Sequence, residues 1–175
     1  PAAQRMLRSV TLTPGARFAP QKPVMGFIGA GNYASRMLIP AFKASGARLA
    51  QIASAGGASS VHLGRKFGFA QATTDTDALL ADADTDIVVV STRHDSHARF
   101  VQRALAAGKH VFVEKPLALT REDLLQIEAA AGRAPKQLLM VGFNRRFAPQ
   151  VQKMAGLLRG APGPKSFIMT VNAGA

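Results

Sequence analysis

Cysteine and tryptophan are absent from the 175 residues, and only one tyrosine occurs. Without cysteine, disulfide scaffolds, thiolate metal sites and cysteine nucleophiles are all excluded, as suits a reducing compartment. Long hydrophobic runs are missing too: the stretch 138–141 is far shorter than the roughly 20 residues of a transmembrane helix. At 47% hydrophobic and 18% charged residues, the chain is still too apolar to be disordered. We therefore expect a globular, cytoplasmic protein without a membrane span.

Acidic residues are absent from the first 74 positions and from every position after Glu128. The formal net charge is +12, from 22 Lys+Arg against 10 Asp+Glu. A basic chain can bind nucleic acid, an anionic membrane or a phosphorylated small molecule; alternatively, a larger protein carries the compensating acids. Specific nucleic-acid binding is disfavoured, because a stacking platform needs surface aromatic residues and most phenylalanines here fall in core-like patterns.

Apolar runs of strand length alternate with helical patterns from Val24 onward. One of them, 87–90, is a β-branched run suited to a strand that is covered on both faces. This alternation predicts an α/β fold, a Rossmann-type doubly wound parallel sheet with helices on both faces. We expect its strands at residues 24–29, 48–54, 69–72, 86–91, 110–113 and 137–143.

The chain divides into three expected segments. Residues 1–23 contain several prolines and no sustained period, which predicts a linker or loosely ordered arm. Residues 24–164 hold the alternating pattern and form the expected NAD(P)-binding Rossmann domain. Residues 165–175 alternate apolar and polar positions, which predicts the first strand of a truncated second domain of α+β type.

The segment 29–34, Gly-Ala-Gly-Asn-Tyr-Ala, fits the pattern G-x-G-x-x-G/A directly after a predicted strand. In a dinucleotide-binding loop, Gly29 would permit the tight turn and Gly31 would let a pyrophosphate approach the backbone. Ala34 would allow close packing of a helix whose N-terminus attracts anions. Small residues also serve ordinary turns, but this position between strand and helix favours dinucleotide binding.

A carboxylate is missing at the end of the second predicted strand, where NAD-binding units usually hold the ribose hydroxyls with Asp or Glu. Hydroxyl and cationic residues that could receive a 2′-phosphate follow instead: Ser54, Ser59, Ser60, Arg65 and Lys66. Alternatively, these are loop residues and solvated helix cations. The expected cofactor is NADP or NAD, with a slight preference for NADP.

Three further polar segments follow predicted strands, where ligands of such sheets bind. In the segment 91–97, His94 and His97 have metal-pair spacing, but no further ligands support a metal and none is expected. Lys115, in Glu-Lys-Pro, could act as acid or base or orient a substrate oxygen; the alternative is a solvated cation. Asn144 could reach the same crevice.

Together these segments resemble one family. Residues 24–164 are similar to the nucleotide-binding domain of the glucose–fructose oxidoreductase, inositol dehydrogenase and MocA-type oxidoreductases. The resemblance is carried by the Gly29 loop, 92–97, Glu-Lys-Pro at 114–116 and 142–145, in that order. The basic arm followed by this unit also resembles the rear half of two-domain bacterial oxidoreductases.

The resemblance implies hydride transfer between nicotinamide and a sugar or polyol, a homo-oligomeric full-length protein, and roles for individual residues. Lys115 would be catalytic and, with Asn144, would face the substrate. The implied cofactor-binding residues are Gly29, Gly31, Asn32, Tyr33, Ser54, Ser91, Thr92, His97 and Glu114, to which the 2′-phosphate interpretation adds Arg65.

Two departures limit what the resemblance implies. Arg93 stands where the family often has proline, and the family's main acid/base, a histidine in its second domain, lies beyond Ala175. The fragment alone is therefore expected to be inactive. A dinucleotide-binding or regulatory module without catalysis is the alternative function.

Overall fold

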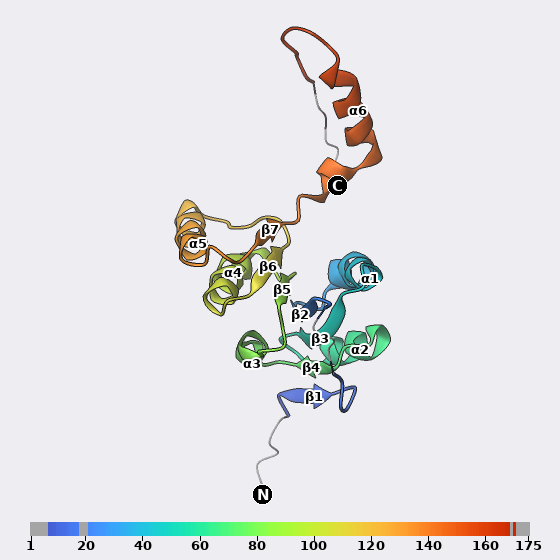
Figure 1. Ribbon diagram of the computed structural model, residues 1–175, viewed down its shortest axis with the longest axis vertical. Helices are drawn as coiled ribbons and strands as arrows, with labels where there is room; N and C mark the ends of the chain where they lie inside the picture. Colours follow the sequence, from blue (N-terminus) through green and yellow to red (C-terminus); the bar gives the residue numbers. More distant parts are fainter. Residues whose placement is uncertain (1–6, 18–20, 169, 171–175) are drawn as a thin grey trace, which may run out of the picture. The chain divides into compact units, whose positions relative to one another are not determined.

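The computed structural model describes residues 7–17, 21–168 and 170. It divides into two compact units, Pro1–Gly142 and Phe143–Ala175. The first unit holds the sheet (Figure 1), and each unit is described by itself.

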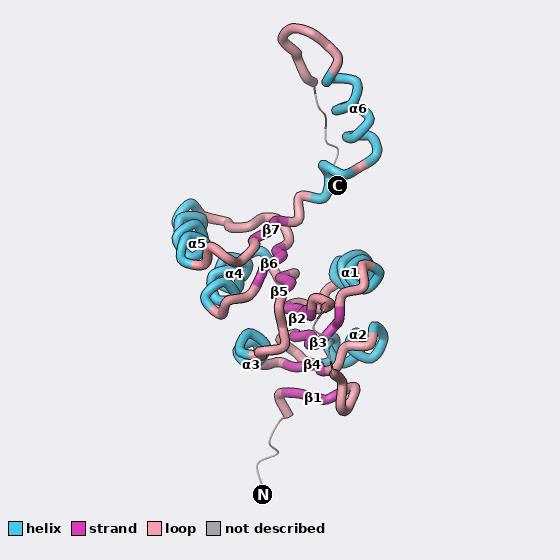
Figure 2. Tube along the Cα trace, in the orientation of Figure 1, coloured by secondary structure: helices cyan, strands magenta, loops and turns pink. Residues whose placement is uncertain are grey.

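Seven strands form one sheet in the order β1-β4-β3-β2-β5-β6-β7 (Figure 2). Every neighbouring pair from β4 to β7 is parallel, and β1 joins β4 in the antiparallel direction. The predicted doubly wound parallel sheet is therefore confirmed. The strands are β1 (Ser9–Thr11), β2 (Val24–Ile28), β3 (Arg48–Ala53), β4 (Gln71–Thr73), β5 (Ile87–Val90), β6 (His110–Val113) and β7 (Leu139–Val141).

Helices cover both faces of this sheet. Figure 1 shows α1 and α2 on one face and α3, α4 and α5 on the other. A π-helical turn, Ala34–Leu38, leads directly into α1. The helices of this unit are α1 (Ile39–Ala44), α2 (Ala58–Phe67), α3 (Thr76–Ala81), α4 (His97–Ala106) and α5 (Arg121–Arg133).

The core is split by the sheet into two apolar clusters. Ile28 and Val90 belong to the cluster under α3, α4 and α5, whereas Phe27 and Val89 belong to the cluster under α1 and α2. Successive side chains of a strand point to opposite faces, so β2 and β5 need apolar residues at consecutive positions. This explains why these central strands appear in the sequence as unbroken apolar runs.

β1 corrects the prediction of an entirely loose N-terminal arm. Ser9 pairs with Thr73, and Thr11 pairs with Gln71, at the edge of the sheet. Three residues are too few to show a period of two, and none of them is fully buried. Sequence patterning therefore carries little signal for such an edge strand.

The second unit contains a short 3₁₀ turn, η3 (Asn144–Phe147), and helix α6 (Pro149–Arg159). Residues 165–168 and 170, predicted as part of a strand, have no regular structure, and the rest of 165–175 lies outside the described residues. The compact units meet at residue 142 rather than at 164. The second domain stays a prediction. Among the described residues, no helix combines the length and apolarity needed to cross a membrane.

Candidate functional site

A cleft opens where the chain reverses its direction of travel through the sheet. β2 and β5 lie side by side, yet the chain leaves β2 towards α1 on one face and leaves β5 towards α4 on the other. Ligands of open α/β sheets bind at this point, beyond the carboxyl ends of the strands. Here the cleft has a volume of about 910 Å³, and it is lined by five of the residues that the family resemblance assigns to the cofactor: Gly29, Gly31, Ser54, Ser91 and Thr92.

Gly29 makes the tight turn at the end of β2. Its φ is +113°, and an added Cβ would lie 2.5 Å from the Ser91 carbonyl oxygen. The Gly29 amide donates a hydrogen bond to the Ala53 carbonyl over 2.9 Å, and the Ser91 hydroxyl donates to the Gly29 carbonyl over 3.3 Å. The loop is thus fixed between the ends of β3 and β5, in a conformation that only glycine adopts easily.

Gly31 has the opposite surroundings. An added Cβ there would meet nothing within 4 Å. Exposed Asn32 and Tyr33 follow and are already helical, so the continuous helical run extends from residue 32 to Ala44, and Gly31 before it has no side chain that could cap it. Uncapped amides at the start of a helix attract anions, so the open backbone at Gly31 suits a pyrophosphate.

The five residues predicted to receive a 2′-phosphate are divided: two line the first cleft, two line another cleft, and Lys66 lines neither. Ser54 lines the first cleft, and its hydroxyl oxygen accepts hydrogen bonds from the Ser60 amide and the Ser59 hydroxyl, each over 3.2 Å. Ser54 therefore also caps the start of α2. Arg65 lines a second cleft of about 920 Å³ instead, which shares residues 55–56 and Thr74 with the first.

Two arginines that the sequence prediction did not place at the site also line the first cleft. They are Arg93, in the loop after β5, and Arg99, in the first turn of α4. A cation near a helix N-terminus is unfavourable, and the first turn of α4 contains no acidic residue that would offset the charge of Arg99. The position of Arg99 near the start of this helix was the signal in the sequence that could have pointed to the site. Asp95 also lines the cleft, but the two arginines leave an excess of positive charge among the described residues of its lining.

His97 lies behind the cleft wall rather than in it. Its side chain is fully buried, with Nδ1 2.7 Å from the Pro116 carbonyl oxygen and Nε2 3.1 Å from the Thr92 carbonyl oxygen. The ring thus links the loops that follow β5 and β6. In this position His97 supports the two loops, and its approach to the nicotinamide stays a prediction. Both nitrogens have protein partners, and the described residues contain no cluster of three or more potential metal ligands.

Glu114 and Lys115 begin the loop after β6. Glu114 is 8% exposed, and a Cβ on Gly142 would lie 2.6 Å from its Oε1, so glycine at 142 leaves space for this carboxylate. Lys115 is exposed at the carboxyl edge of the sheet, next to the residue that His97 contacts. Neither lines the cleft, and Asn144 lies in η3 of the second unit.

The sequence and the fold match known proteins over this unit. The family model described as "Oxidoreductase family, NAD-binding Rossmann fold" matches residues 24–143. Inositol 2-dehydrogenase of Paracoccus denitrificans is 41% identical over 91 residues, which are 50% of this chain and 27% of that protein. 1,5-Anhydro-D-fructose reductase of Ensifer adhaerens is 35% identical over 109 residues, which are 62% of this chain and 33% of that protein.

A similar fold occurs in a solved structure, a 3-ketoreductase from Actinomadura kijaniata in complex with TDP-benzene and NADP. The two are 32% identical with a TM-score of 0.72, and the match covers 79% of this chain and 43% of that one. This chain thus spans less than half of each of these three proteins. It belongs to the glucose–fructose oxidoreductase, inositol dehydrogenase and MocA family, with an NAD(P)-binding Rossmann domain at residues 24–143.

Proposed function

We propose that this chain is the cofactor-binding part of an enzyme that oxidises an alcohol group of a sugar, polyol or derivative. The observation that carries the proposal is the Gly29 turn, which is packed against Ser91 and opens into the first cleft. A nicotinamide cofactor supplies the acceptor for the hydride when it is bound. The relatives named as an inositol dehydrogenase and an anhydrofructose reductase support the substrate class.

The residues of the first cleft fit a dinucleotide. The open backbone at Gly31 and the uncapped helix start would hold the pyrophosphate, while Arg93 and Arg99 would contribute positive charge. Ser54, at the end of β3, would face the adenosine ribose. Ser91 and Thr92, beyond β5, would lie towards the nicotinamide half.

Lys115 is proposed as the catalytic residue of this part of the enzyme. Its ammonium group would hold or release a proton at the substrate oxygen, or orient that oxygen by its charge. Support comes from its position at the end of β6, the strand next to β5. His97 holds the neighbouring Pro116 carbonyl and so limits the movement of this loop. Glu114 is proposed to contact the cofactor and Asn144 the substrate, as the family resemblance implies.

The proposal extends to partners and compartment. We propose a homo-oligomeric, cytoplasmic full-length protein that takes a small sugar or polyol and binds neither specific nucleic acid nor membrane. The lack of cysteine supports the compartment, and the relatives' names support the substrate class. Size-exclusion chromatography with light scattering on the full-length protein tests its oligomeric state.

Cofactor titration tests the central proposal. NADPH and NADH are each added to the chain, and binding is followed by nicotinamide fluorescence. Gly31→Glu places a carboxylate in the open space for the pyrophosphate, and Gly132→Glu adds the same charge at a position on α5 that is equally open. We expect Gly31→Glu to weaken binding more than tenfold and Gly132→Glu to leave it unchanged. Failure of the unmodified chain to bind either cofactor would overturn the proposal.

A further inference from the structure

The second cleft is lined by cationic side chains from two separate elements. Arg8 immediately precedes β1, while His62 and Arg65 lie one helical turn apart on α2. No carboxylate occurs among the described residues that line this cleft. β1 and Arg8 precede the segment matched by the family model, which begins at residue 24. Arg8 therefore lies outside the matched segment.

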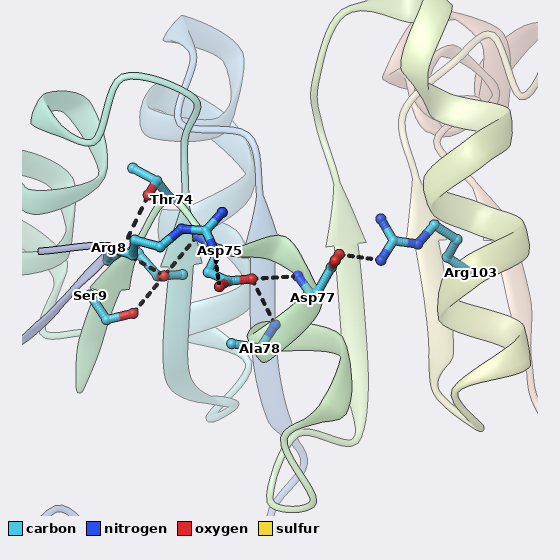
Figure 3. Close-up of polar contacts among 8 residues, drawn as sticks. Arg8, Ser9, Thr74, Asp75, Asp77, Ala78 and Arg103 are labelled. Carbon is cyan, nitrogen blue, oxygen red and sulfur yellow. Dashed lines mark hydrogen bonds and ion pairs between the residues drawn. The ribbon is translucent and has the colours of Figure 1, made fainter. Parts of the chain in front are cut away.

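Backbone hydrogen bonds fix the place of Arg8. Its carbonyl oxygen accepts from the Thr74 amide over 2.8 Å and from the Thr73 hydroxyl over 2.9 Å. Thr74 also donates through its hydroxyl over 3.3 Å (Figure 3). The Arg8 backbone is thus held at the edge of β4, and a change of its side chain leaves these bonds in place.

The Arg8 side chain is held by one ion pair and still has N–H groups that can bind a phosphate. One guanidinium nitrogen lies 3.2 Å from Oδ2 of Asp75, whose other oxygen caps α3 by accepting from the amides of Asp77 and Ala78 (Figure 3). The Arg8 side chain is 73% exposed. A guanidinium group has five N–H donors, so several remain available to a phosphate. Arg65 is exposed as well.

The two clefts meet where the adenosine end of a dinucleotide would lie. Residues 55–56, directly after Ser54, line both. A ribose at the end of β3 would therefore direct a 2′-phosphate towards the cations of the second cleft. No carboxylate stands in segment 54–60 to bind a free 2′-hydroxyl or to repel a phosphate there.

We infer that Arg8 and Arg65 bind the 2′-phosphate of NADP in the second cleft, so that the N-terminal strand determines cofactor preference. This inference rests on the proposed function, because the first cleft must hold the rest of the cofactor. Asp75 acts as the counterion that keeps the Arg8 guanidinium in place before the phosphate arrives.

Paired titrations with NADPH and NADH test the inference. Arg8→Gln and Arg65→Gln each remove one charge, and Arg17→Gln removes the same charge from an exposed residue that lines neither cleft. We expect Arg8→Gln and Arg65→Gln each to weaken NADPH binding about tenfold, the usual loss for a charged hydrogen bond, and NADH binding less than twofold. Arg17→Gln should change neither.

Competition with adenosine nucleotides measures how much the 2′-phosphate contributes to binding. Adenosine 2′,5′-bisphosphate should displace NADPH better than AMP does, and Arg8→Gln should remove most of that advantage. Thermal unfolding of each variant checks that the fold is intact. Equal losses for NADPH and NADH, or an unchanged NADPH affinity in Arg8→Gln, would overturn the inference while leaving the proposed function in place. If the unmodified chain binds neither cofactor, the proposed function itself fails.

Discussion

A methyl group added at Gly29 has no space in this fold. With φ at +113°, an L-residue is strained by about 1–3 kcal/mol. The new Cβ would also lie 2.5 Å from the Ser91 carbonyl oxygen and 2.6 Å from its carbonyl carbon, both of which are backbone atoms of the residue that follows β5. Overpacking of this kind costs about 1–3 kcal/mol more. Gly29→Ala should therefore destabilise the chain by about 2–6 kcal/mol, a large share of the roughly 5–15 kcal/mol that keeps a domain folded.

Urea unfolding measures this loss. Gly132→Ala is the matched control, because Gly132 lies in α5 with no atom within 4 Å of an added Cβ, and its stability should stay the same or rise slightly. Adding Ser91→Gly to Gly29→Ala should restore stability only in part, since it removes the overlap with Ser91 Oγ at 2.9 Å but not the two shorter overlaps with the Ser91 backbone. A Gly29→Ala protein as stable as Gly132→Ala would refute the assigned turn.

Three further changes test other parts of the molecule. His97→Leu should lower the free energy of unfolding in urea by about 2 kcal/mol or more, because the buried ring that lies within hydrogen-bond distance of two loop carbonyls is lost; an unchanged midpoint would contradict this link. The hydrogen bond and the charge of Arg103 hold the pKa of Asp77 below its ordinary 3.8, so the pair stabilises the fold above that pH and stops doing so as pH falls through the lowered pKa. Acid unfolding of Asp77→Asn at low salt should lack this component, and identical acid curves would exclude it. In the full-length protein, Lys115→Met should cut turnover about 10²–10⁴-fold while NADPH still binds; unchanged turnover would remove its catalytic role.

The sheet was predictable because its signals are local. The run Val88–Val90 and the glycine that follows Ile28 mark β5 and the end of β2 without any knowledge of their neighbours. The contact that makes Gly29 necessary could not be foreseen, since Ser91 lies 62 residues away in the chain. β1 was missed for a related reason: its pairing with β4 joins residues at least 60 positions apart.

The structure distributes the predicted site residues over more places than their order in the sequence suggests. Ser54 and Arg65 were grouped from their closeness in sequence, yet α2 carries Arg65 to the wall of a different cleft. His97 was expected near the cofactor because the family resemblance implies it, and nothing in the sequence indicated that both ring nitrogens lie within hydrogen-bond distance of backbone carbonyls. Arg99 went unnoticed because charged residues on a helix are usually solvated, and only the arrangement of loops shows that it faces the cleft.

β1 also determines how the domain can be shortened for expression. A boundary chosen from the family match would begin at residue 24 and would remove the strand that covers β4. The exposed edge of β4 would then offer unpaired backbone groups to a second molecule, which is a common route to aggregation. Such a fragment would lose Arg8 as well. Poor solubility and weak NADPH binding would therefore occur together in the shortened protein, and neither would indicate a defect in the Gly29 loop.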